Sequence, residues 1–199
     1  MELNYKIAKN KLLASDPEGC RQFFEQNGYL LEAAYCCLVD DDITNAKEFF
    51  ARYAQKDIRA NWGVFLCGLI DKKISTYPSY FQLRNFLEID LNFLMKYYKG
   101  EYVENIIKYS DWLCTINPEV HKYIGRVFLK CGYEQEGIYF LKQAEDYFYN
   151  DPELHYLFAE YYFSKKETEN TIKYIGKCLG VLPGYFPAIN LQRKLKSDC

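Results

Sequence analysis

The apolar positions in the second half of the chain follow a helical pattern. They recur at spacings of three and four, the period of one face of an α-helix. Two segments carry the same pattern 34 positions apart. The matching pairs are His121 with His155, Ile124 with Phe158, Gly125 with Ala159, and Phe128 with Tyr162. The pattern therefore predicts a repeated helical unit.

Each segment begins with a helix-start signal. Residues 117–119 read Asn-Pro-Glu and residues 151–153 read Asp-Pro-Glu. A polar residue followed by proline is typical of an N-cap and a first helical turn. A short polar break then precedes a second helix, at residues 130–132 in one unit and 164–167 in the other. A single hairpin cannot bury both of its apolar faces, so we expect the units to stack.

This arrangement resembles the tetratricopeptide repeat, whose pattern is Trp-x2-Leu-Gly-x2-Tyr, then Ala-x3-Phe, then Pro. The first unit continues its match at Gly137, Leu141 and Ala144, and the second at Thr171, Ile175, Cys178 and Pro183. Near the N-terminus, Ala34, Ala46 and Phe50 fit the same frame. The resemblance implies an all-α protein, folded as a right-handed α-solenoid of antiparallel helix pairs.

The regularity of this frame divides the chain into segments. The frame is clearest in the last hundred residues, and the stretch from Pro78 to Tyr98 contains no helix breaker. We expect N-terminal capping helices at 1–27, degenerate repeat units at 28–71, an irregular unit with a long helix at 72–117, two clearer units at 118–184 and a C-terminal capping helix at 185–199.

Composition narrows the class of partner. The formal net charge is −2 and the aromatic fraction is 18%. A weakly acidic chain lacks the concentrated positive charge of a nucleic-acid binder. Its apolar runs are too short for a membrane span, and its first residues contain no apolar signal core. We expect a cytoplasmic protein with no nucleic-acid or membrane partner.

The eight cysteines allow more than one interpretation. An even number is compatible with a disulfide framework. However, no Cys-x2-Cys pair occurs, and most of the cysteines fall at apolar helix positions. We expect most of them to be small buried residues. A redox role for Cys36 and Cys37 is the alternative.

Residues that could carry chemistry are few. His121 and His155 occupy the same slot of consecutive repeats, where packing is expected and a shared metal site is the alternative. The acidic run 40–42 is expected to form a turn before a helix, with a cation site as the alternative. No P-loop, dinucleotide fingerprint or nucleophile elbow occurs. The sequence therefore predicts a protein that is not an enzyme, with no cofactor, no metal and no catalytic residue.

The resemblance places a partner-binding groove on the first helix of each unit. Lys122 and Arg126, four residues apart, would form a basic spot beside aromatic side chains. Such a spot would suit an acidic or carboxylate group of a peptide; a solvated face with an Arg126–Glu160 ion pair is the alternative. The expected groove residues are Tyr35, Leu38, Tyr97, Tyr98, Lys122, Arg126, Leu129, Tyr156, Glu160 and Phe163.

These features favour a protein–protein interaction scaffold, adaptor or chaperone-like module. Its partner would be a peptide or helical segment of another protein, or a second copy of the chain in a homodimer. One alternative is an accessory or regulatory subunit that docks onto a catalytic partner. Others are a cysteine-based redox- or metal-responsive protein and an enzyme with a deep pocket.

Overall fold

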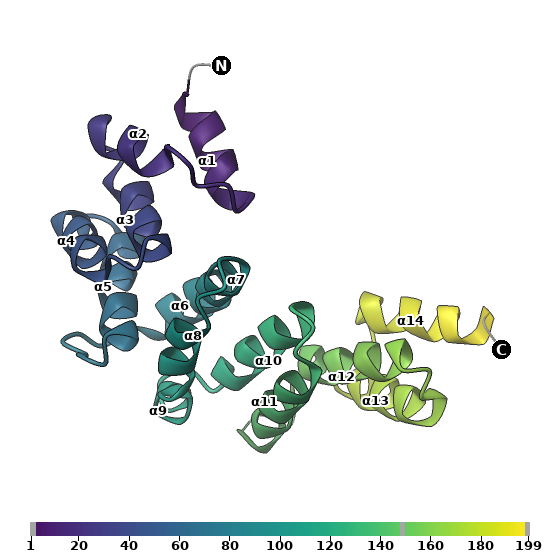
Figure 1. Ribbon diagram of the computed structural model, residues 1–199. Coiled ribbons are helices and arrows are strands. Elements are labelled where there is room, and N and C mark those ends of the chain that lie inside the picture. The colour runs from purple at the N-terminus through teal and green to yellow at the C-terminus, as the bar shows by residue number, and fades with distance from the viewer. Residues whose placement is uncertain (1–2, 148–149, 198–199) are drawn as a thin grey trace. The chain divides into compact units, whose positions relative to one another are not determined.

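The computed structural model describes residues 3–147 and 150–197, and all regular elements in these residues are helices (Figure 1). The chain divides into two compact units, Met1–Asn117 and Pro118–Cys199. The expected all-α class is therefore confirmed. Successive helices pair within each unit, which is consistent with a helical solenoid.

The N-terminal unit begins with three helices that share one apolar core. Ala8 and Leu12 of the first helix meet Cys20 and Phe24 of the second and Ala33 of the third. The third helix packs on the fourth, and the fourth on the fifth. These helices are α1 (Tyr5–Leu13), α2 (Cys20–Gln26), α3 (Leu30–Val39), α4 (Ile43–Tyr53) and α5 (Ile58–Ile70).

The irregular middle of the chain contains an unbroken helical path. It starts at α6 (Tyr80–Gln82), where Ser79 and Gln82 form a reciprocal capping box, and ends with α7 (Glu88–Lys96). Between them, η1 (Leu83–Leu87) is a π-helical turn. Such widened turns frequently occur at functional sites. Two short helices, α8 (Gly100–Ile107) and α9 (Ser110–Cys114), complete the unit.

The C-terminal unit consists of two hairpins and a final helix. α10 (Val120–Lys130) packs closely on α11 (Glu134–Tyr147), and α12 (Pro152–Ser164) on α13 (Thr168–Val181). α14 (Phe186–Ser197) covers the end and contributes Leu191 to the core. The core of the second hairpin centres on Phe158, Ala159 and Ile175.

The two helix-start signals behave differently. Asp151 caps α12 as expected, because its side chain accepts from the backbone N–H groups of Glu153 and Leu154. The expected start at Asn117-Pro118 was wrong, since α10 begins at Val120. The Asn117 amide instead donates to the Tyr80 carbonyl oxygen at 3.4 Å within the N-terminal unit.

Two glycines allow α10 and α11 to approach closely. A Cβ atom added at Gly125 would lie 2.9 Å from the Gly137 carbonyl oxygen and 2.8 Å from Leu141 Cδ2. One at Gly137 would lie 3.0 Å from the Leu129 backbone nitrogen. Backbone atoms cannot move aside as a flexible side chain can, so this seam requires glycine.

We expect Gly125→Ala to lower the free energy of unfolding by about 1–3 kcal/mol, because the added methyl overpacks the seam. The matched control is Gly176→Ala in α13, where an added Cβ meets nothing within 4 Å. Gly176→Ala should raise stability by about 0.5–1 kcal/mol, because glycine is a poor helix former. Urea unfolding checks both. Equal effects of the two changes would contradict the packing explanation.

Candidate functional site

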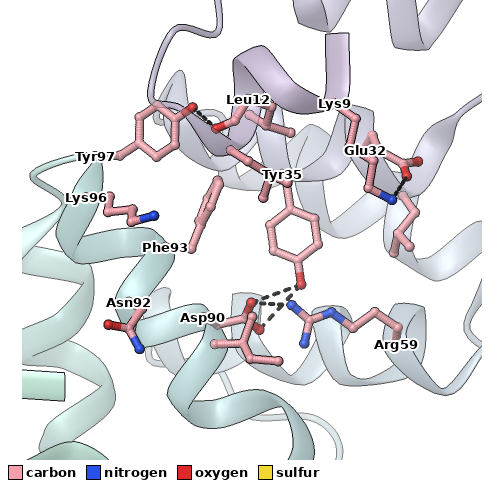
Figure 2. A pocket seen from close by; sticks show the side chains of 13 residues that line it. Lys9, Leu12, Glu32, Tyr35, Arg59, Asp90, Asn92, Phe93, Lys96 and Tyr97 are labelled. Atoms are coloured by element: carbon pink, nitrogen blue, oxygen red, sulfur yellow. Dashed lines mark hydrogen bonds and ion pairs between the residues drawn. The ribbon is translucent and has the colours of Figure 1, made fainter. Parts of the chain in front are cut away.

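The N-terminal unit contains a cavity of about 440 Å³ (Figure 2). Its walls come from α1, α3, α5 and α7, which are far apart along the chain. Most of the walls are apolar side chains, with charged groups at the floor and rim. The lining residues used below are Lys9, Leu12, Leu31, Glu32, Tyr35, Arg59, Ile89, Asp90, Asn92, Phe93, Lys96 and Tyr97.

The floor of the cavity is organised by one buried carboxylate. Asp90 is 1% exposed and accepts from the Trp62 indole N–H at 2.5 Å and the Tyr35 hydroxyl at 3.2 Å. Arg59 forms an ion pair with the same carboxylate. Burial raises the pKa of Asp90, and the Arg59 charge and the three donors oppose that rise. Asp90 therefore binds α3 and α5 to its own helix, α7.

The Arg59 guanidinium is held between aromatic rings. Its central carbon lies 5.2 Å from the centre of the Tyr35 ring and 4.6 Å from that of Phe86. These contacts are in the range of cation–π attraction. Nη1 of Arg59 is buried and has no hydrogen-bond partner. Burial, with Asp90 adjacent, also raises the pKa of the Tyr35 hydroxyl well above its usual range.

The rim of the cavity carries opposite charges. Glu32 accepts from the Tyr5 hydroxyl at 2.7 Å and pairs with Lys9 at 3.5 Å. The Tyr97 hydroxyl donates to the Leu12 carbonyl oxygen at 2.5 Å. Lys96 lines the same cavity, and no residue within the described ranges pairs with its ammonium group. The rim therefore presents one uncompensated positive charge.

Some expected groove residues meet at this cavity. Tyr35 and Tyr97, which are 62 positions apart in the sequence, both line it. Leu38 does not, because it is fully buried in the core, and its groove assignment was wrong. Tyr98 is 94% exposed and lies outside the cavity, in the turn after α7.

A hollow of about 300 Å³ lies in the C-terminal unit. Arg126 and Leu129 of α10 face Leu157 and Glu160 of α12 across it. Three of these four are expected groove residues. Tyr156 and Phe163, also expected there, are half-buried and pack against the core of the unit instead. Tyr156 still donates to Glu160 through its hydroxyl, at 3.2 Å.

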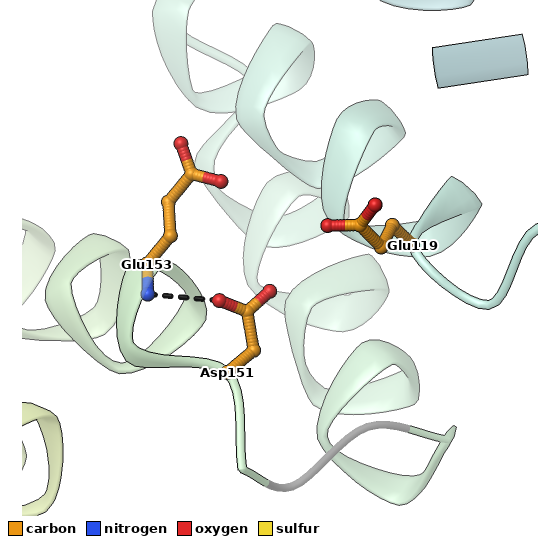
Figure 3. A group of neighbouring side chains, drawn as sticks. All are labelled: Glu119, Asp151 and Glu153. Atoms are coloured by element: carbon orange, nitrogen blue, oxygen red, sulfur yellow. Dashed lines mark hydrogen bonds between the residues drawn. The ribbon is translucent and has the colours of Figure 1, made fainter. Parts of the chain in front are cut away.

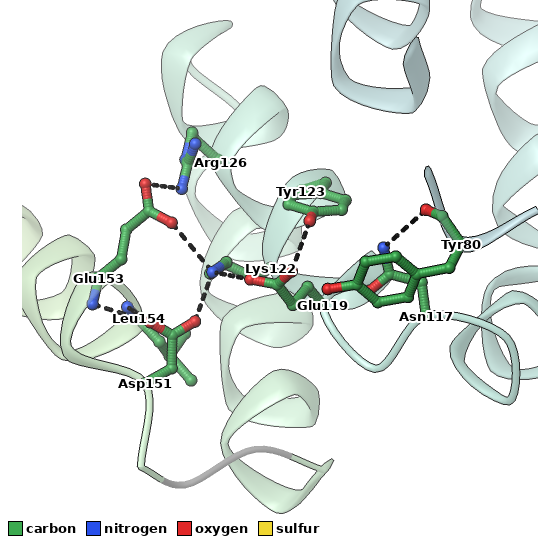
Figure 4. A network of polar contacts seen from close by, with 9 residues as sticks. All are labelled: Tyr80, Asn117, Glu119, Lys122, Tyr123, Arg126, Asp151, Glu153 and Leu154. Atoms are coloured by element: carbon green, nitrogen blue, oxygen red, sulfur yellow. Dashed lines mark hydrogen bonds and ion pairs between the residues drawn. The ribbon is translucent and has the colours of Figure 1, made fainter. Parts of the chain in front are cut away.

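Lys122 was expected in the groove, but it is 2% exposed and cannot meet a partner. Its ammonium group lies among three carboxylates (Figure 4). The distance to Glu119 is 2.7 Å and to Glu153 2.9 Å, and Asp151 is closer still. Glu119 stands at the start of α10, whereas Asp151 and Glu153 stand at the start of α12, so Lys122 joins the two hairpins of the unit.

The same three carboxylates are the only described group with the spacing of a metal site, with ligand atoms within 4.8 Å of one another (Figure 3). The Lys122 ammonium already occupies the position between them. This cluster is therefore built around an internal cation. Arg126 pairs with Glu153 at 2.6 Å, whereas the alternative drawn from the sequence paired it with Glu160.

The remaining candidate residues have structural partners. His121 packs against Phe140, with ring centres 5.8 Å apart, and His155 against Tyr174 at 6.3 Å. In the acidic run, Asp40 and Asp42 pair with Arg21, and Asp41 with Lys99. Asp42 also caps α4.

The cysteines are mostly buried, as expected. Burial raises the pKa of Cys36, Cys37 and Cys67 to about 12 in each case, so these thiols stay protonated and unreactive at neutral pH. Cys131 is exposed, and Cys199 lies outside the described residues.

Sequence analysis missed the residues that form the cavity floor. Asp90 falls between Leu87 and Leu94 on the stripe that α7 buries, and a charge on an apolar stripe is a usable signal. Arg59 and Trp62 gave no such signal, because they lie 31 and 28 positions from Asp90.

Comparison of the chain with models of protein families, with curated proteins and with solved structures found no match. Among the residues that the structure describes, no helix combines the length and apolar character needed to cross a membrane. The functional assignment therefore depends on the two sites above.

The Lys122 cluster leads to a stability prediction. We expect Lys122→Met to lower the free energy of unfolding by about 3–5 kcal/mol at neutral pH, because it leaves three carboxylates without their buried cation. Lys142→Met, on the exposed side of α11, is the control and should change stability by no more than about 0.5 kcal/mol. Chemical denaturation measures both. A Lys122→Met protein as stable as the control would contradict this role.

Glu153 should make part of the stability dependent on pH. Burial opposes its ionisation, but the hydrogen bond and charge of Lys122, together with Arg126, lower its pKa overall. The stabilisation is then fully present above the ordinary glutamate pKa of about 4.3 and is lost as the pH falls through the lowered value. We expect Glu153→Gln to cost about 0.5–1 kcal/mol at pH 7. The difference from wild type should shrink as the pH falls below about 4.3, and a constant difference would contradict the assignment.

Proposed function

We propose that this chain is a non-catalytic protein-interaction module of tetratricopeptide type, with the right-handed superhelix of that family. Its partner is a peptide or helical segment that binds the hollow between α10 and α12. The cytoplasmic location expected from the sequence stays part of this proposal.

The observation that carries the proposal is the lining of the hollow in the C-terminal unit. Apolar side chains of Leu129 and Leu157 lie beside the opposite charges of Arg126 and Glu160. A surface of this kind can bury an apolar side chain and orient the segment that carries it. Two of the lining side chains also have partners within the unit, because Leu129 packs against Gly137 and Arg126 pairs with Glu153.

The absence of a reacting arrangement at either site supports a non-catalytic function. The one buried carboxylate of the cavity, Asp90, is occupied by three donors. The thiols of Cys36 and Cys67 are buried and protonated. The Asp90 contacts hold α3, α5 and α7 together and are not arranged around a reacting atom, and the two thiols line neither site.

The test is affinity capture from the native source with variants of the hollow. Leu157→Ser combined with Glu160→Lys changes the hollow without touching the Lys122 cluster. Ile172→Ser is the matched control, since Ile172 is a 57% exposed apolar residue of α13 outside the hollow. We expect wild type and Ile172→Ser to retain the same protein in stoichiometric amount, and the double variant to lose it.

Circular dichroism of each variant shows whether the helices remain. A folded double variant that retains the partner as well as wild type would move the contact elsewhere and contradict the proposed site. The absence of any stoichiometric partner would contradict the proposed function itself.

A further inference from the structure

The cavity of the N-terminal unit has the dimensions of a small-molecule site. Ligand pockets in proteins usually enclose about 300–1,000 Å³ and are lined mainly by apolar and aromatic side chains. This cavity has about 440 Å³ and apolar walls that include Leu12, Leu31 and Phe93. Figure 2 shows Leu12 and Phe93 on the side of this space away from the Asp90 carboxylate.

The polar groups of the cavity are mostly committed to one another. Asp90 is occupied by Arg59, Trp62 and Tyr35. Glu32 is occupied by Tyr5 and Lys9. A polypeptide segment brings an N–H and a C=O at nearly every residue, and each needs a partner when buried. The cavity offers too few groups for this, so it suits a compact apolar molecule better than a peptide.

The charged residues that line the cavity determine which charge a bound molecule should carry. Three cationic residues line the cavity, Lys9, Arg59 and Lys96, against the two carboxylates Glu32 and Asp90. Lys9 and Arg59 each have a carboxylate partner. Lys96 remains as the group without a counter-ion, at the rim and on the same helix as Asp90. One net positive charge matches one negative group.

We infer that this cavity binds a small organic monoanion, a carboxylate with an aromatic or branched apolar body. The apolar body fills the space between Leu12, Leu31 and Phe93. The carboxylate pairs with the Lys96 ammonium at the rim. This site is separate from the partner-binding hollow of the C-terminal unit, and neither proposal depends on the other.

Three probes with the same body and different charge test the inference. They are 4-phenylbutanoate, 4-phenylbutan-1-ol and 4-phenylbutan-1-amine, titrated into the full chain by ¹⁵N-resolved NMR. We expect the carboxylate to bind most tightly and the amine least. The backbone signals of Ile89 and Phe93 and the indole signal of Trp62 should shift. The indole signal of Trp112, which does not line the cavity, should not.

Variants separate charge recognition from apolar binding. Lys96→Gln should weaken the binding of the carboxylate about fivefold, the upper range for the loss of one partly exposed ion pair. The affinity for the alcohol should not change. Lys56→Gln, at an exposed lysine outside the cavity, is the control and should leave all three affinities unchanged. Ile89→Glu adds a negative charge at a residue that is 57% exposed and should reverse the order of carboxylate and amine.

Several results would overturn the inference. They are equal affinities for the three probes, a carboxylate affinity unaffected by Lys96→Gln, and signal shifts confined to residues other than the cavity lining and Trp62, which donates to Asp90 at its floor. Failure of all three probes to bind at millimolar concentration would also overturn it. The helical signal of each variant is measured first, and Ile89→Glu supplies the charge test if Lys96→Gln does not fold.

Discussion

The buried carboxylate of Asp90 is the constraint on which the N-terminal unit depends. An anion removed from water must be compensated, or it costs several kcal/mol. Here the compensation comes from Arg59 and Trp62 on α5 and from Tyr35 on α3. Because each donor must lie within hydrogen-bonding distance of the carboxylate, Asp90 restricts the relative positions of α3, α5 and α7. The cavity is the space that this arrangement leaves above them.

The C-terminal unit also contains a buried charge with compensating partners, but there the buried group is a cation and its partners are anions. There a buried ammonium, Lys122, is compensated by carboxylates at the starts of α10 and α12. Apolar packing alone is tolerant of small sliding motions, whereas a buried charge accepts only positions within hydrogen-bond reach of its partners. Both units therefore combine an apolar core with one electrostatic point that sets the register between helices.

Local periodicity predicted much of the fold. The 34-residue spacing was enough to anticipate the hairpins of α10 to α13, and the Asp151-Pro152 signal gave a correct cap. The start at Val120 was missed: Glu119 is the residue before the helix, and the side-chain amide of the expected cap, Asn117, donates to the Tyr80 carbonyl oxygen. Capping signals describe what a residue can do locally, and they do not report the tertiary contacts that its side chain makes.

Prediction of the site was limited for a similar reason. The repeat resemblance placed both Tyr35 and Tyr97 in the expected groove, and both line the cavity. It also placed Lys122 on an open surface, because the partners that bury its charge include Asp151 and Glu153, which belong to the next repeat. The period of a helix reports which residues share a face, but it does not report what packs on that face.

The turns after several helices contain residues at positive φ that are not glycine: Ser15, Asp41, Lys72, Tyr98 and Lys166. Gly132 serves the same geometry after α10. A side chain in the left-handed region costs about 1–2 kcal/mol, which helix packing on both sides outweighs. The hairpins thus do not require a particular type of residue at the turn. Exchanging one non-glycine residue for another at these turns should therefore leave the helix pairs in place, so the turns put little constraint on the sequence.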